Sequence, residues 1–166
     1  MQSTRHGNEA YHEALVHPGA FAHPNPKRVA IIGGGEGATL REALKHKSVE
    51  TVTMIEIDGA MVSFSREHLP DWNTCSDIEG SAHWCGDDPR AIMRYEDGMA
   101  WFDDRFSDNE KKKAEKYEED PFDILIMDAL DPQDNIVSIV IAIFLICSSY
   151  FYSISYKPFN TLSDYS

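Results

Sequence analysis

Residues 29–42 read VAIIGGGEGATLRE and join an apolar run to a glycine-rich loop and a helical pattern. The run Val29–Ile32 predicts a strand covered on both faces, and residues 38–46 predict a helix. This order is typical of loops that bind phosphate through backbone N–H groups at a helix N-terminus. Glu36 lies within the loop, and its negative charge would oppose a phosphate. The loop, with its glycines Gly33, Gly35 and Gly37, therefore predicts a different ligand.

Strand and helix patterns alternate along the rest of the chain up to residue 135. Strands are expected at residues 49–58, 90–98 and within 122–135, and helices at 59–70, ended by Pro70, and at 99–106. A further helix is expected at 8–17, closed by Pro18. Residues 71–89 show no clear period, and the charged segment 107–121 is interpreted as a solvated insertion without a function. This alternation predicts an α/β fold with a parallel sheet and flanking helices.

The composition restricts the classes of partner. The chain has 166 residues and a net charge of −13, which argues against nucleic acid because phosphate backbones are bound by clustered Lys and Arg. An acidic balance suits cationic ligands, although it also serves solubility alone. Cys75, Cys85 and Cys147 have long, irregular spacing and predict no disulfide framework. Together with the absence of a secretory signal pattern, this predicts a reducing, cytoplasmic setting.

Residues 136–166 differ abruptly from the preceding sequence and contain one Lys and one Asp. Their dense apolar part, Ile136–Cys147, has 12 residues and is short for a membrane span. A membrane anchor is therefore the less favoured reading. A buried strand or helix and a non-native tail also remain open.

Acidic residues follow each of the four expected strands. Glu36 follows the first strand, Glu56 and Asp58 end the second, Asp97 ends the third, and Asp128 with Asp131 follow the fourth. Carboxyl ends of parallel strands meet at one edge of the sheet, where ligands of open α/β folds bind. Capping of a helix is an alternative explanation for Asp58 and Asp97. The pattern predicts an acid-lined site at this edge.

The second strand indicates what the site holds. Glu56 lies about 20 residues after the glycine loop, where an acidic side chain can accept hydrogen bonds from both ribose hydroxyls. Because Glu36 disfavours a pyrophosphate, the expected ligand carries adenosine without phosphates, as S-adenosylmethionine does. Glu36 would also repel a carboxylate at the ligand's tail and attract an amine, which favours decarboxylated S-adenosylmethionine.

Five segments together resemble the polyamine synthases, the aminopropyltransferases that include spermidine, spermine and thermospermine synthases. They are YHEALVHP (11–18), HPNPKRVAIIGGGEGATLREALKH (23–46), VETVTMIEID (49–58), YEDG (95–98) and FDILIMDALDP (122–132). The sequences of the first two segments are more similar to those of the thermospermine synthase branch. The resemblance implies a Rossmann-like fold of the S-adenosylmethionine-dependent methyltransferase type, decarboxylated S-adenosylmethionine as donor, and putrescine or spermidine as acceptor.

The resemblance also implies roles for individual residues. Asp128 would be the general base that deprotonates the acceptor amine. Donor contacts would come from the glycine loop, from Glu56 at the ribose and from Asp97 with Gly98 near the adenine. Acceptor or aminopropyl contacts are implied for the following residues: Gln2, Tyr11, His12, Glu36 and Asp131.

The chain also departs from the family pattern. Family members begin with a small β-stranded domain used in dimerisation, and residues 1–135 correspond to an incomplete Rossmann-like domain that starts after it. Beyond residue 135 the family continues through further strands, so the acceptor half of the site is expected to be incomplete. Two alternatives therefore remain: an N-methyltransferase on the same scaffold, and a non-catalytic domain that binds nucleoside or polyamine.

No metal site is expected. His12, His17 and His23 lie close together in the sequence, but their spacing does not place them on one helical face. His83 and Cys85 form a pair without further ligands nearby in the sequence.

Overall fold

The computed structural model describes residues 8–106 and 122–129. In chain order its elements are α1 (Asn8–Ala22), β1 (Arg28–Gly33), α2 (Ala38–Leu44), β2 (Thr51–Ile55), α3 (Gly59–His68), α4 (Pro70–Asn73), the 3₁₀ helix η1 (Cys85–Asp87), β3 (Ala91–Arg94), α5 (Gly98–Phe106) and β4 (Ile124–Asp128). The expectations for Gln2, Asp131, the charged segment 107–121 and the tail 136–166 lie outside the described residues. No helix of the described ranges is both long and apolar enough to cross a bilayer.

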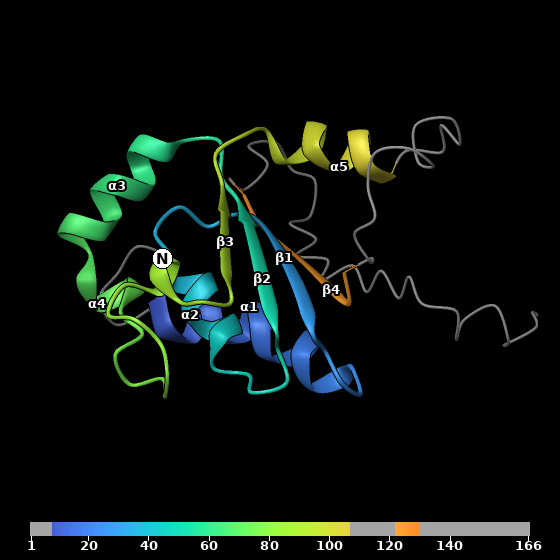
Figure 1. Cartoon of the computed structure of the whole chain (residues 1–166), viewed down its shortest axis with the longest axis horizontal. Coiled ribbons are helices and arrows are strands. Elements are labelled where there is room, and N and C mark those ends of the chain that lie inside the picture. Colours follow the sequence, from blue (N-terminus) through green and yellow to red (C-terminus); the bar gives the residue numbers. More distant parts are fainter. Residues whose placement is uncertain (1–7, 107–121, 130–166) are drawn as a thin grey trace, which may run out of the picture.

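The four strands form one parallel sheet in the order β3-β2-β1-β4 (Figure 1). β1 is central and pairs with β2 on one side and β4 on the other, so that Gly33 lies opposite Asp128. Every strand therefore ends at the same edge. The predicted α/β fold with a parallel sheet is confirmed.

The two faces of the sheet bury different side chains, because successive residues of a strand point to opposite sides. Val29 and Ile31 belong to the larger core with the helices α1 and α2, which lie together on one side of the sheet (Figure 1). Ala30 and Ile32 belong to a smaller cluster, against which Phe102 of α5 packs. Coverage on both faces explains the continuous apolar run of β1.

Pro18 does not end the first helix, contrary to the prediction, because α1 continues to Ala22. A proline inside a helix loses one hydrogen bond and clashes with the preceding turn, at a cost of about 3 kcal/mol. Here Pro18 is exposed, so water can reach the affected turn. Leu15, Val16 and Ala20 are buried on both sides of it. Packing of this helix against the core offsets the local penalty.

Two strands and the third helix are shorter than expected. β2 ends at Ile55 and β3 at Arg94, so that Glu56 and Asp97 stand in the loops that follow these strands. Helix α3 ends at His68, and Pro70 begins α4 rather than closing α3. Proline is well suited to the first turn of a helix, where its missing N–H would have no partner.

Cys75 and Cys85 form a disulfide, with Cα atoms 5.0 Å apart, which contradicts the prediction of unpaired cysteines. The residues between them form a loop whose ends meet, since Thr74 pairs with Trp84 and the Cys75 N–H donates to the His83 carbonyl. Spacing along the chain cannot reveal this closure. The cysteines therefore no longer support the predicted reducing compartment, and cytoplasmic location stays a prediction.

Candidate active site

A cavity of about 640 Å³ opens at the carboxyl edge of the sheet. Each strand contributes an acidic residue to its lining: Glu36 after β1, Glu56 and Asp58 after β2, Asp97 after β3, and Asp128 at the end of β4. The predicted convergence of these carboxylates on one cleft is confirmed. Five acidic side chains around one cavity favour a positively charged ligand.

The glycine loop passes directly over the end of β4. Gly33 has a φ of 85°, and a Cβ atom there would stand 2.2 Å from the backbone oxygen of Asp128. The Gly34 N–H donates to the same oxygen over 3.0 Å. Gly35 approaches the next acid, because a Cβ on it would lie 3.1 Å from Glu56 Oε2. The loop thus brings its backbone against both Asp128 and Glu56, and the approach to the Asp128 backbone at Gly33 leaves no room for a side chain.

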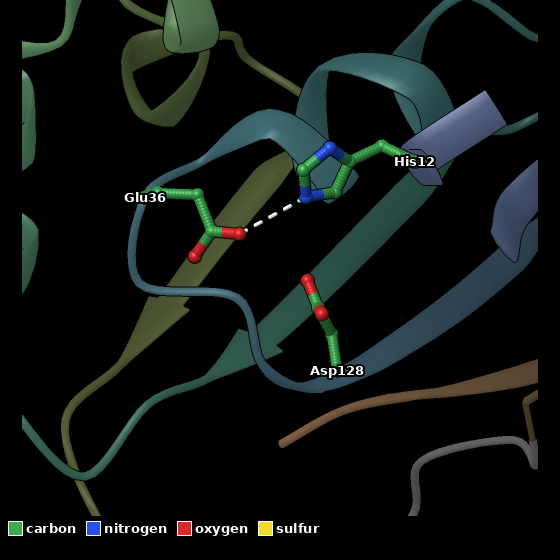
Figure 2. A group of neighbouring side chains, drawn as sticks. All are labelled: His12, Glu36 and Asp128. Carbon is green, nitrogen blue, oxygen red and sulfur yellow. Dashed lines mark hydrogen bonds and ion pairs between the residues drawn. The ribbon is translucent and has the colours of Figure 1, made fainter. Parts of the chain in front are cut away.

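Helix α1 supplies a partner for the acid inside the loop. His12 is fully buried, and its Nε2 lies 3.0 Å from Glu36 Oε1 (Figure 2). Burial opposes ionisation of Glu36, but the hydrogen bond with His12 and a backbone hydrogen bond outweigh it and hold the pKa of Glu36 below its ordinary value. Glu36 therefore carries a negative charge at neutral pH.

Asp128 lies below this pair and points toward it (Figure 2). The Thr39 hydroxyl, from the first turn of α2, donates a hydrogen bond to Asp128 Oδ2. Burial, together with the negative charges of Glu36 and Glu56, raises the pKa of Asp128 to about 6 despite this hydrogen bond. A carboxyl group with such a pKa is a stronger base than an ordinary aspartate and remains largely ionised at pH 7.

His12, Glu36 and Asp128 offer ligand atoms that all lie within 4.8 Å of one another. A group of this kind can surround an ammonium or a metal ion. Tyr11 packs edge-on against His12 with ring centroids 4.9 Å apart. Tyr11 therefore packs behind the group, against His12, and is not among the residues that line the cavity.

Asp58 and Asp97 also cap helices, as the alternative interpretation predicted. Asp58 Oδ1 accepts from the N–H groups of Ala60 and Met61 at the start of α3. Asp97 Oδ1 accepts from Met99 and Ala100 at the start of α5. Since both residues line the cavity as well, capping fixes their carboxylates at its edge.

Sequence reasoning missed three features of the site. Thr39 was not identified as a partner of Asp128, because the two residues are 89 positions apart. Asn73 is buried, and its side-chain amide donates to the Glu36 carbonyl over 3.3 Å. This hydrogen bond connects the loop to α4. The exposed apolar side chains of Ile57, Met61 and Met99 line the same cavity as the acids. The sequence could have indicated this apolar lining only through the proximity of these residues to Glu56 and Asp97 along the chain.

Solved structures share this fold. A spermidine synthase in complex with the transition state analogue AdoDATO matches with a TM-score of 0.57 and 38% identity, covering 74% of this chain and 34% of that one. Spermidine synthase from Thermotoga maritima matches with a TM-score of 0.55 and 38% identity, covering 73% and 34%. The predicted methyltransferase-type fold is confirmed by these structures.

Related sequences point to the same family. Polyamine aminopropyltransferase 1 of Hyperthermus butylicus is 46% identical over 132 residues, which are 80% of this chain and 39% of the relative. The polyamine aminopropyltransferase of Pyrobaculum aerophilum is 42% identical over 135 residues, 81% of this chain and 40% of the relative. The chain thus spans about two fifths of the length of these relatives. The family model described as the spermine/spermidine synthase domain matches residues 8–145, and with this match the chain belongs to the spermine/spermidine synthase family.

Proposed function

We propose that the protein acts in polyamine biosynthesis as an aminopropyltransferase, with decarboxylated S-adenosylmethionine as donor and putrescine or spermidine as acceptor. The observation that carries this proposal is the convergence of Glu36, Glu56 and Asp128 on one cavity beside a glycine loop. The names of the relatives, polyamine aminopropyltransferases and spermidine synthases, support the same assignment.

The donor would lie along the glycine loop. Glu56 accepts hydrogen bonds from the ribose hydroxyls, and the adenine occupies the part of the cavity between Asp97, Gly98 and the apolar side chains of Ile57 and Met99. The sulfonium and the aminopropyl ammonium are both positive, which suits the acidic lining. Ionised Glu36 attracts the ammonium and repels the additional carboxylate of S-adenosylmethionine.

The chemical step is a displacement at carbon. The acceptor nitrogen attacks the aminopropyl carbon bonded to sulfur, the C–N bond forms, and the C–S bond breaks. Its electron pair returns to sulfur and leaves neutral methylthioadenosine. The leaving group needs no acid, so the demand falls on the nucleophile, because an ammonium has no lone pair.

Asp128 meets this demand as general base. An alkyl amine with a pKa near 10 must give up a proton, which at pH 7 costs about 4 kcal/mol. The raised pKa of Asp128, about 6, reduces the unfavourable difference between the proton donor and the proton acceptor. Asp131 and Gln2 are proposed to orient the acceptor nitrogen for attack. Tyr11, which does not line the cavity, is proposed to act through its contact with His12.

The test combines binding and product analysis on the purified chain. Calorimetry should give tighter binding of decarboxylated S-adenosylmethionine than of S-adenosylmethionine, and methylthioadenosine should compete with both. Incubation with putrescine or spermidine and each donor, followed by mass spectrometry, identifies the transferred group. An added aminopropyl group supports the proposal. An added methyl group would identify an N-methyltransferase, and donor binding without any product would identify a non-catalytic domain.

A further inference from the structure

Two Glu-x-x-x-His pairs meet where α1 contacts α2. Glu13 and His17 stand four residues apart on α1, and Glu42 and His46 stand four residues apart at the end of α2 and just beyond it. On α1 this spacing places Glu13 and His17 on one face of the helix. His17 Nδ1 lies 2.9 Å from His46 Nε2, and His17 Nε2 lies 3.2 Å from Glu42 Oε2. No metal site was expected from the sequence because the histidines at positions 12, 17 and 23 were considered without these pairs.

Three of these side chains offer ligand atoms at one point. Atoms of Glu13, His17 and Glu42 all lie within 4.8 Å of one another. One imidazole nitrogen and two carboxylate oxygens form a ligand set that suits zinc, with a fourth position open to water. Glu13 is exposed and the His17 side chain is 25% exposed, so an ion can enter from solvent.

Glu42 supplies the second observation. Its side chain is fully buried, and its two oxygens have different surroundings. Oε1 pairs with Arg41 Nε over 2.8 Å and with Lys45 Nζ over 2.9 Å. Oε2 accepts no hydrogen bond from any residue in the described ranges, although His17 Nε2 lies nearby. A buried carboxylate oxygen that accepts no hydrogen bond is costly. This oxygen contacts His17 Nε2 and lies among the ligand atoms of Glu13 and His17.

The contact between the two histidines makes His17 a suitable ligand. When His17 Nδ1 carries the proton and donates it to His46 Nε2, the lone pair of His17 Nε2 faces the Glu42 carboxylate. Two lone pairs then oppose each other, and a cation between them removes the repulsion. Histidines that bind metals commonly donate their other ring N–H to a partner, which fixes the tautomer.

We propose that Glu13, His17 and Glu42 form a zinc site that joins α1 to α2, with His46 holding the His17 ring in position. Such a site would stabilise the helix that carries His12 against the helix that follows the Glu36 loop. This inference does not depend on the proposed transfer reaction. The rival explanation is a proton on His17 Nε2, which would point to Glu42 either in the neutral imidazole or, with both ring nitrogens protonated, as part of an ion pair.

The test is a calorimetric titration of the full chain with zinc chloride at pH 7.5, after removal of metal by a chelator and of any purification tag. We expect one zinc ion per chain and a rise in melting temperature. Glu13→Gln changes an exposed residue, so the variant should fold, which circular dichroism checks. This variant and His17→Gln should each weaken binding at least tenfold and abolish the thermal shift. His46→Gln should weaken binding by roughly 10- to 100-fold.

Two controls locate the site. His68→Gln removes an exposed imidazole on α3. Asp128→Asn alters the second group of potential metal ligands, which His12, Glu36 and Asp128 form. Both variants should bind zinc with the affinity of the parent chain. Absence of saturable zinc binding would overturn the proposal in favour of a proton on His17 Nε2. Binding that survives both Glu13→Gln and His17→Gln, or that is lost in Asp128→Asn, would overturn it in favour of a different site.

Discussion

The backbone oxygen of Asp128 lies 2.2 Å from the point where a Cβ atom on Gly33 would stand. This relationship joins the glycine loop to the end of β4 and predicts a large effect of Gly33→Ala. The positive φ of 85° alone costs about 1–2 kcal/mol with a side chain. Because the contacting atom belongs to the backbone and cannot rotate away, we expect a loss of at least about 3 kcal/mol in unfolding free energy, measured by urea denaturation.

Gly80→Ala is the matched control. Gly80 has a similar φ of 81°, but a Cβ there would meet no atom within 4 Å. It should lose about 1–2 kcal/mol, the backbone cost alone. Equal losses in the two variants would show that the close approach to Asp128 contributes nothing.

Asp128→Asn should stabilise the protein at neutral pH. Because the pKa of Asp128 is raised from 3.8 to about 6, the folded state binds a proton more readily than the unfolded state. Protonated Asp128 therefore stabilises the folded parent chain below about pH 4. This contribution is lost as the pH rises through about 6 and the group ionises. The amide cannot ionise and avoids this loss, which the shift from 3.8 to about 6 puts at about 3 kcal/mol. Melting temperatures of both chains from pH 4 to 7.5 test this. A constant difference across the range would contradict it.

The same substitution should remove the chemistry. With the proposed general base absent, aminopropyl transfer should fall by roughly 10²- to 10⁴-fold while donor affinity changes little. In the parent chain the rate should rise with pH through about 6 as Asp128 ionises. Mass-spectrometric product formation measures both effects. Full activity of Asp128→Asn would exclude Asp128 as the base.

Glu36→Gln should reduce donor discrimination. Loss of the charge weakens attraction of the aminopropyl ammonium and removes repulsion of the S-adenosylmethionine carboxylate. We expect the affinity ratio between the two donors, measured by calorimetry, to fall by about tenfold, which corresponds to about 1.4 kcal/mol.

Glu56→Gln is the comparison for Glu36→Gln. Glu56 is proposed to bind the ribose that both donors share, so its substitution should weaken both by a similar factor. An unchanged affinity ratio between the two donors in Glu36→Gln would show that Glu36 does not interact with the end of the donor that carries the amine and, in S-adenosylmethionine, the carboxylate.

Reduction of the Cys75–Cys85 disulfide should destabilise the protein. The bond closes a loop with a sequence separation of 10, for which the chain-entropy relation gives about 2–3 kcal/mol. Thermal unfolding with and without dithiothreitol measures the effect. The double variant Cys75→Ala with Cys85→Ala should lose similar stability and should not respond to the reductant. An unchanged melting temperature of the parent chain after its disulfide has been reduced would contradict the prediction.

Local patterns predicted much of this fold correctly. The apolar run of β1 and the glycines after it depend on rules that act within a few residues: burial on both faces and backbone conformation. The convergence of Glu36, Glu56, Asp97 and Asp128 also followed from the sequence, because every parallel strand delivers its carboxyl end to the same edge. Pro18 was the failure of a local rule, since buried residues on both sides of it hold α1 together.

Partners across the chain could not be predicted in this way. The hydrogen bonds of Thr39 with Asp128 and of His12 with Glu36, the Cys75–Cys85 disulfide and the meeting of His17 with Glu42 join segments far apart in sequence. The sequence by itself determined which edge of the sheet is acidic. Only the tertiary structure decided that the pKa of Glu36 is lowered and that of Asp128 is raised, because burial, hydrogen bonds and neighbouring charges set each pKa and depend on packing in three dimensions.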